Sequence, residues 1–135
     1  MNGQQWITAG LLHLMSLRGH DKLTAAHLMF LNNLDCAGTY ASEVARRMGV
    51  SRQAVSRTTR ELQSLRILKL GADPLRKTQK TIRMTAHGEQ VVLDARACLD
   101  EVETVLTLRL GARDVAKLSA ILNRDWGPVP GRAVD

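Results

Sequence analysis

The sequence predicts a mainly α-helical fold with one small β-hairpin, and three observations support this prediction. Apolar residues recur every three to four positions in separate stretches, enough for about six helices. Two short runs of branched and apolar residues flank a segment rich in Pro, Gly, Arg and Lys, which indicates an antiparallel hairpin. Aromatic residues make up only 3% of the chain, so aliphatic side chains must fill the core, as suits packed helices. With 135 residues, a single domain is expected.

Two helices are predicted in the first part of the chain. The apolar residues of Trp6–Leu17 keep helical spacing, and this helix is expected to end near Gly19. A second helix is expected from Lys22 onward, with Thr24 as its N-cap. The first apolar run is short and interrupted by polar residues, so we expect neither a signal peptide nor a membrane span.

The segment Thr39–Leu70 predicts two helices joined by a tight turn. Where the helices touch, a small residue is required, and Ala45 supplies it. Four positions on, Gly49 allows the positive φ of the turn, and six further on Val55 packs back into the joint. Ser51 is the expected N-cap of the second helix. This spacing is typical of a helix-turn-helix rather than of an ordinary helical hairpin.

The second helix of this pair carries polar and basic residues suited to reading DNA. Arginine can bridge O6 and N7 of guanine, and glutamine can bridge N6 and N7 of adenine. Arg60 lies one turn further on and is expected to meet phosphate, and phosphate-only contact is the alternative for every arginine here. The candidate DNA-binding residues of this helix are Ser51, Arg52, Gln53, Ser56, Arg57 and Arg60.

A β-wing is predicted after the helix-turn-helix. Its strands are expected at Ile67–Leu70 and Thr81–Met84, and the intervening turn offers Arg76, Lys77 and Lys80 to the DNA. A solvated basic loop is the alternative. The surrounding segment from 37 to 90 holds 11 Lys and Arg against four acids, a net charge of +7, while the rest of the chain sums to −1. Such a one-sided basic segment is typical of contact with a phosphate backbone.

Two further helices are predicted at the C-terminal end. Thr85 is expected to cap a long helix, Gly111 to end it, and a last helix to run from about Arg113 to Asn123. A helix of about 20 residues would protrude from a small lobe, so we expect a second copy of the chain to cover it. The expected layout is one domain over 1–135, with dimerisation helices at 1–20 and 90–126, a winged lobe at 22–89, and a flexible tail at 127–135.

In the order of its elements the chain resembles the MarR family of bacterial winged helix-turn-helix regulators. The matching motifs are Leu23-Thr24-Ala25, the stretch from Ala45 to Leu62, and Ile82–Gly88, with Met84 where the family has leucine. The resemblance implies a homodimer with interlocked outer helices, bound to a pseudo-palindromic operator and usually acting as a repressor. Members of the family commonly carry Asp-Arg-Arg at the tip of the wing, whereas the corresponding positions of this chain are Arg76, Lys77 and Thr78. Insertion into the minor groove and plain phosphate contact therefore both stay open.

The resemblance also raises the question of a regulatory ligand. Some members of the family bind small aromatic acids near the dimer helices, where this chain has His13, Arg18, His27, Met29 and Phe30. These residues could line a pocket for an aromatic or anionic effector, although apolar residues at helical spacing are more often simply core.

Other functional classes find little support in the sequence. No phosphate-binding loop or nucleophile motif indicates an enzyme, the histidines lack metal-ligand spacing, and no cofactor is expected. Two cysteines, Cys36 and Cys98, suit a reducing cytoplasm and do not suggest redox sensing. The sequence therefore predicts a cytoplasmic, sequence-specific regulator of transcription on double-stranded DNA. The alternatives are a winged-helix protein-interaction module and a nonspecific architectural DNA binder.

Overall fold

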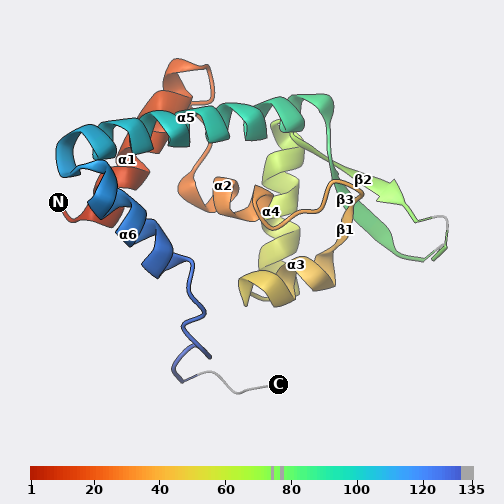
Figure 1. Ribbon diagram of the computed structural model, residues 1–135. Helices are drawn as coiled ribbons and strands as arrows, with labels where there is room; N and C mark the ends of the chain where they lie inside the picture. The colour runs from red at the N-terminus through yellow and green to blue at the C-terminus, as the bar shows by residue number, and fades with distance from the viewer. Residues whose placement is uncertain (74, 77, 132–135) are drawn as a thin grey trace. The chain divides into compact units, whose positions relative to one another are not determined.

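The computed structural model of the chain, shown in Figure 1, describes residues 1–73, 75, 76 and 78–131. Within these residues lie six helices and three strands, so the predicted winged helix-turn-helix fold is confirmed. The chain divides into two compact units, residues 1–99 and 100–135. The elements are α1 Gly3–Leu17, α2 Ala25–Leu31, β1 Thr39–Tyr40, α3 Ala41–Met48, α4 Arg52–Ser64, β2 Leu68–Ala72, β3 Lys80–Met84, α5 Ala86–Leu110 and α6 Ala112–Leu122.

The first helix begins earlier than the apolar pattern indicates. Asn2 and Gln5 form a capping box, in which the Gln5 N–H donates to Asn2 Oδ1 at 2.9 Å. In return the Asn2 N–H donates to Gln5 Oε1 at 3.0 Å. These bonds satisfy backbone donors that a helix start otherwise leaves unpaired, so α1 extends back to Gly3.

The turn between α3 and α4 is built by local backbone chemistry. Gly49 ends α3 with φ 64°, and the N–H of Val50 donates to the carbonyl of Ala45 at 3.1 Å. Ser51 then starts α4, because its Oγ accepts from the N–H of Ala54 at 3.1 Å. Val55 is buried, with 1% of its surface exposed, and packs within the core of the first unit.

The sheet has a strand that the sequence analysis missed. The strand order is β1-β3-β2, with Thr39 opposite Ile82 on one side and Leu70 opposite Ile82 on the other. The predicted hairpin strands are present, but β2 is shifted to Leu68–Ala72 and β3 starts at Lys80. Ile67 lies just before the strand, where its N–H donates to the carbonyl of Leu62 on α4 at 2.9 Å and its carbonyl accepts from the N–H of Thr85 at 2.9 Å. Figure 1 shows the hairpin projecting beside α4.

One hydrophobic core holds the first unit together. It joins the end of α1, the helix-turn-helix, the sheet and the first part of α5. Cys98 is fully buried within it, whereas Cys36 is exposed. The largest fully buried side chains are Phe30, Met15, Leu62, Ile67, Ile82, Val44, Val55, Val91 and Cys98.

The second unit contains the end of α5 and all of α6. Gly111, with φ 89°, separates the two helices as predicted, and α6 covers 112–122. Val102 and Val115 are buried, but many larger apolar side chains are exposed. These exposed residues are Leu108, Leu110, Leu118, Ile121, Leu122 and Trp126. In the described part of the chain, no helix has the length and apolar character that a membrane span requires.

Candidate nucleic-acid interface

Helix α4 has a packing face and an exposed polar face. Val55, Thr59 and Leu62 are buried, and the Thr59 hydroxyl donates to the Val55 carbonyl at 2.7 Å, so this polar group is satisfied inside the core. All six residues that the sequence nominates for DNA contact are exposed. They are Ser51, Arg52, Gln53, Ser56, Arg57 and Arg60.

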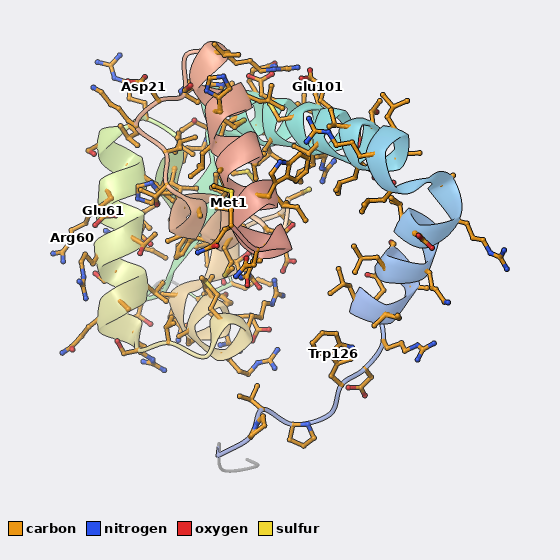
Figure 2. All side chains as sticks on the ribbon, turned by 90° about the vertical axis from the view of Figure 1, so that its left-hand side faces the viewer. Met1, Asp21, Arg60, Glu61, Glu101 and Trp126 are labelled. Carbon is orange, nitrogen blue, oxygen red and sulfur yellow. The ribbon has the colours of Figure 1, made fainter. Side chains whose placement is uncertain are left out.

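The three arginines of the exposed face are not engaged by other side chains. Arg52, Arg57 and Arg60 take part in no ion pair or side-chain hydrogen bond with the residues that the structure describes. Figure 2 shows Arg60 on the outer side of α4. Their charges and donors are therefore available to an external anion.

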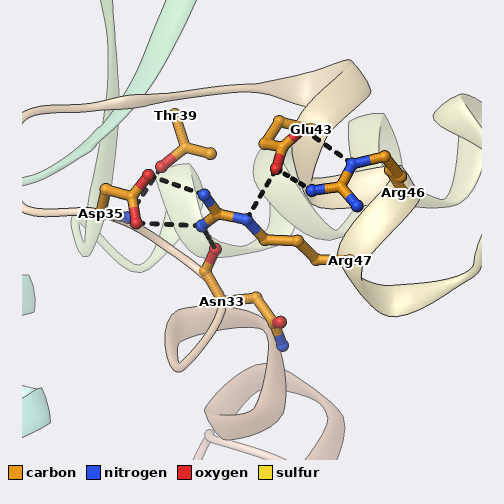
Figure 3. Close-up of polar contacts among 6 residues, drawn as sticks. All are labelled: Asn33, Asp35, Thr39, Glu43, Arg46 and Arg47. Atoms are coloured by element: carbon orange, nitrogen blue, oxygen red, sulfur yellow. Dashed lines mark hydrogen bonds and ion pairs between the residues drawn. The ribbon is translucent and has the colours of Figure 1, made fainter. Parts of the chain in front are cut away.

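The two arginines of α3 are used differently, as Figure 3 shows. Arg47 binds the carboxylate of Asp35 through two hydrogen bonds of 3.0 and 2.9 Å. Arg47 also donates from Nη1 to the carbonyl of Asn33 at 2.9 Å and from Nε to Glu43 Oε1 at 3.0 Å. Arg46 pairs with the same Glu43. Arg47 therefore fastens α3 to the loop before β1, whereas Arg46 pairs within α3, and both charges are partly neutralised.

The carboxylates of this network titrate below their usual range. Hydrogen bonds from Arg46 and then from Arg47 lower the pKa of Glu43 to about 2. The hydrogen bond from Arg47 also lowers the pKa of Asp35. Both groups are ionised at neutral pH, so the network is intact there.

We expect Glu43→Gln to reduce the acid sensitivity of the fold. Because the pKa of Glu43 falls from 4.5 to about 2 in the folded chain, its stabilisation is fully present above 4.5 and is lost as the pH falls toward 2. Chemical unfolding at several pH values between these limits measures the effect. The wild-type chain should lose more stability across this window than the variant, and equal losses would contradict the prediction.

The wing offers fewer described residues. Lys80 and Arg76 are exposed, and the guanidinium carbon of Arg76 lies 5.8 Å from the centre of the Tyr40 ring, within cation–π range. The Asp73 carboxylate accepts from the N–H of Leu75 at 2.9 Å and so shapes the turn. Lys77, the remaining wing candidate, lies outside the described residues.

The residues nominated for an effector pocket occupy different environments. Phe30 is core, with 1% of its surface exposed, while His13 and Met29 are exposed. Arg18 Nη1 lies 3.6 Å from Asp94 Oδ1. His27 is buried and bonded to a neighbouring helix. The effector pocket therefore stays a prediction.

Several long-range polar contacts were not foreseen from the sequence. His20 Nε2 lies 2.7 Å from Asp94 Oδ2, and hydrogen bonds from His20 and Gln90 lower the pKa of Asp94. Two others join Arg47 to Asp35 and His27 to Glu61. Each partner is an ordinary polar residue of its helix or loop, so no local pattern marks it.

A helix-turn-helix followed by a β-hairpin defines the winged-helix class of proteins. A sequence model of the MarR family matches residues 21–77, which include the helix-turn-helix and strand β2. This part of the chain is therefore similar to the MarR family, which supports the resemblance that the sequence indicates.

Solved structures support the same fold. Wild-type MarR from E. coli is 21% identical, with a TM-score of 0.71 over 88% of this chain and 87% of that one. A mutant of E. coli MarR complexed with operator DNA is 22% identical, with a TM-score of 0.70 over 88% and 84%. The YusO protein from Bacillus subtilis is 20% identical, with a TM-score of 0.69 over 87% and 82%. A comparison with curated protein sequences finds no match.

Proposed function

We propose that the protein is a sequence-specific regulator of transcription that binds double-stranded DNA. It acts as a homodimer on a pseudo-palindromic operator in the bacterial cytoplasm, as a repressor that a small aromatic or anionic effector releases, and it has no enzymatic activity. The observation that carries the proposal is the exposed face of α4, on which Arg52, Arg57 and Arg60 have no partner among the described residues.

The spacing on α4 suits one face of a helix in the major groove. Arg52 and Ser56 are four residues apart, as are Gln53 and Arg57, so these side chains share neighbouring turns of one surface. A major groove about 12 Å wide admits such a helix, and each good pairing with a base contributes about 1–3 kcal/mol of discrimination. Arg60 is exposed at the far end of this face, and we expect it to contact a phosphate.

The solved relatives support DNA as the partner. The structure of the E. coli MarR mutant contains operator DNA, and that of a MepR mutant from S. aureus contains an oligodeoxyribonucleotide. The MepR mutant is 18% identical to this chain, with a TM-score of 0.64 over 88% of this chain and 86% of that one. The exposed arginines of α4 are what this chain itself contributes to the argument.

Exposed apolar side chains support a second copy of the chain as the dimer partner. In the second unit Leu108 is 82% exposed, Leu122 57% and Trp126 70%. Several large apolar residues exposed on α5, on α6 and just after α6 indicate a protein-interaction surface. A closed two-fold dimer is the commonest way to cover such a surface.

A binding titration at several salt concentrations tests the proposal. The purified chain is titrated onto duplex DNA from upstream of its own gene and onto scrambled DNA of equal length. We expect tight, selective binding by two chains per site, with an affinity that falls steeply as salt rises. Equal affinity for both DNAs would indicate an architectural DNA binder. Absence of any duplex binding would favour a protein-interaction module.

A further inference from the structure

His27 makes two hydrogen bonds that connect α2 to its surroundings. It lies on α2 with 8% of its surface exposed. The N–H of Thr24 donates to Nδ1 at 3.2 Å, and Nε2 lies 2.8 Å from Glu61 Oε2. Since Nδ1 accepts a hydrogen bond, the ring proton must be on Nε2, which donates it to Glu61. The imidazole therefore connects two helices.

The partner carboxylate belongs to the proposed DNA-reading helix. Glu61 lies four residues after Arg57 on α4, and residues at this spacing on a helix surface readily form ion pairs. The Glu61 side chain is half exposed, yet in the described structure it bonds to His27 rather than to Arg57. Figure 2 labels Glu61 and Arg60 on α4, so this acid belongs to the same helix as the exposed arginines.

We propose that His27 is a positioning residue for DNA recognition. It holds the Glu61 carboxylate toward α2, and this keeps Arg57 available for a base. Without His27, Glu61 pairs with Arg57 and competes with the DNA. The inference rests on the proposed function, because it assigns Arg57 to operator binding.

The variant His27→Glu distinguishes the positioning of Glu61 from the capping of α2, in which His27 accepts from the Thr24 N–H. A carboxylate at this position still accepts from the Thr24 N–H, as the Gln5 side chain does for Asn2 in α1. It cannot donate to Glu61, and two carboxylates there repel each other. The double variant H27E/E61Q restores a donor, since the amide donates to the new carboxylate. The double variant moves the carboxylate from position 61 to position 27 and keeps the number of acidic residues unchanged.

The affinity for duplex DNA from upstream of the gene and for scrambled DNA is measured for both variants and for Glu61→Gln alone. We expect H27E to bind the upstream DNA roughly tenfold more weakly than the wild-type chain does. This change in affinity corresponds to the free energy of one lost hydrogen bond to a charged group. H27E/E61Q should return to within about twofold of wild type. E61Q alone should keep its selectivity, because its amide oxygen still accepts from His27. Wild-type selectivity in H27E, or no recovery in a folded double variant, would overturn the proposal.

Two further experiments apply if the H27E variant does not fold or if the wild-type chain shows no DNA selectivity. If H27E does not fold, His27→Phe fills the buried site without a hydrogen-bond donor. H27F should then bind DNA as expected for H27E, and H27F/E61Q as expected for H27E/E61Q. If the wild-type chain shows no DNA selectivity, the proposed function fails and amide hydrogen exchange of α4 becomes the readout. Exchange should then be faster in H27E and slow again in H27E/E61Q, and equal rates in all three proteins would overturn the positioning role.

Discussion

Arg57→Ala is expected to weaken binding to operator DNA by about 1–3 kcal/mol, roughly 5- to 150-fold. Arg57 is exposed on the polar face of α4 and has no partner among the described residues. Its fork of donors suits the O6 and N7 acceptors of guanine. Alanine removes this pairing along with one positive charge. Scrambled DNA, which offers only the charge interaction, should lose much less affinity.

Lys80→Ala is the matched control for Arg57. Lys80 is an exposed wing residue and loses the same single charge, but we assign it to phosphate contact. Its replacement should weaken binding to both DNAs alike, and it should lower the salt dependence by about one phosphate contact. Titrations of both variants on both DNAs provide the comparison. Equal losses on the two DNAs for Arg57→Ala would rule out base reading by this residue.

Gly88→Ala is expected to destabilise the fold by roughly 3 kcal/mol or more. Gly88 lies in the first turn of α5, where its N–H donates to Thr85 Oγ1 at 3.0 Å. A Cβ at this position would be 2.2 Å from the carbonyl oxygen of Ile67 and 3.1 Å from its carbon. That oxygen also accepts from the N–H and the hydroxyl of Thr85. The close contact is with backbone, so it can be relieved only by moving α5 or the start of β2.

Gly3→Ala provides the control for the Gly88 variant. Gly3 is also in the first turn of a helix, and a Cβ there would meet nothing within 4 Å. This substitution should be neutral or slightly stabilising, because alanine has the higher helix propensity. Thermal and chemical unfolding of both variants measure the difference. A Gly88→Ala chain as stable as wild type would show that α5 can move away from Ile67 at little cost.

The features that the sequence predicted well depend on short-range chemistry. Glycine after a helix and serine before the next are required by the backbone itself, so Gly49 and Ser51 indicate the turn without knowledge of the fold. Helical periodicity likewise located α5 and its end at Gly111. The start of α1 was missed, although the Asn2 and Gln5 capping pair is visible in the sequence.

The features that were missed depend on distant residues. A two-residue strand such as β1 is too short to show periodicity, and only its pairing with β3 identifies it. His27 and Glu61 are 34 positions apart, and Arg47 and Asp35 are 12 apart. The sequence could therefore identify the basic residues of the lobe. It could not show that Arg46 and Arg47 are bound by acids while Arg57 is not.

The separation of the two faces of α4 has a consequence for how this protein can evolve. Val55, Thr59 and Leu62 hold the helix in the core, while Arg52, Gln53 and Ser56 contribute only to the surface. Substitutions at such surface positions usually change stability by no more than about 0.5 kcal/mol. If these positions read DNA as proposed, a gene duplicate can acquire a new target sequence through them while its scaffold stays unchanged. Under the same proposal, the target preference of a lineage can drift quickly over an almost constant fold.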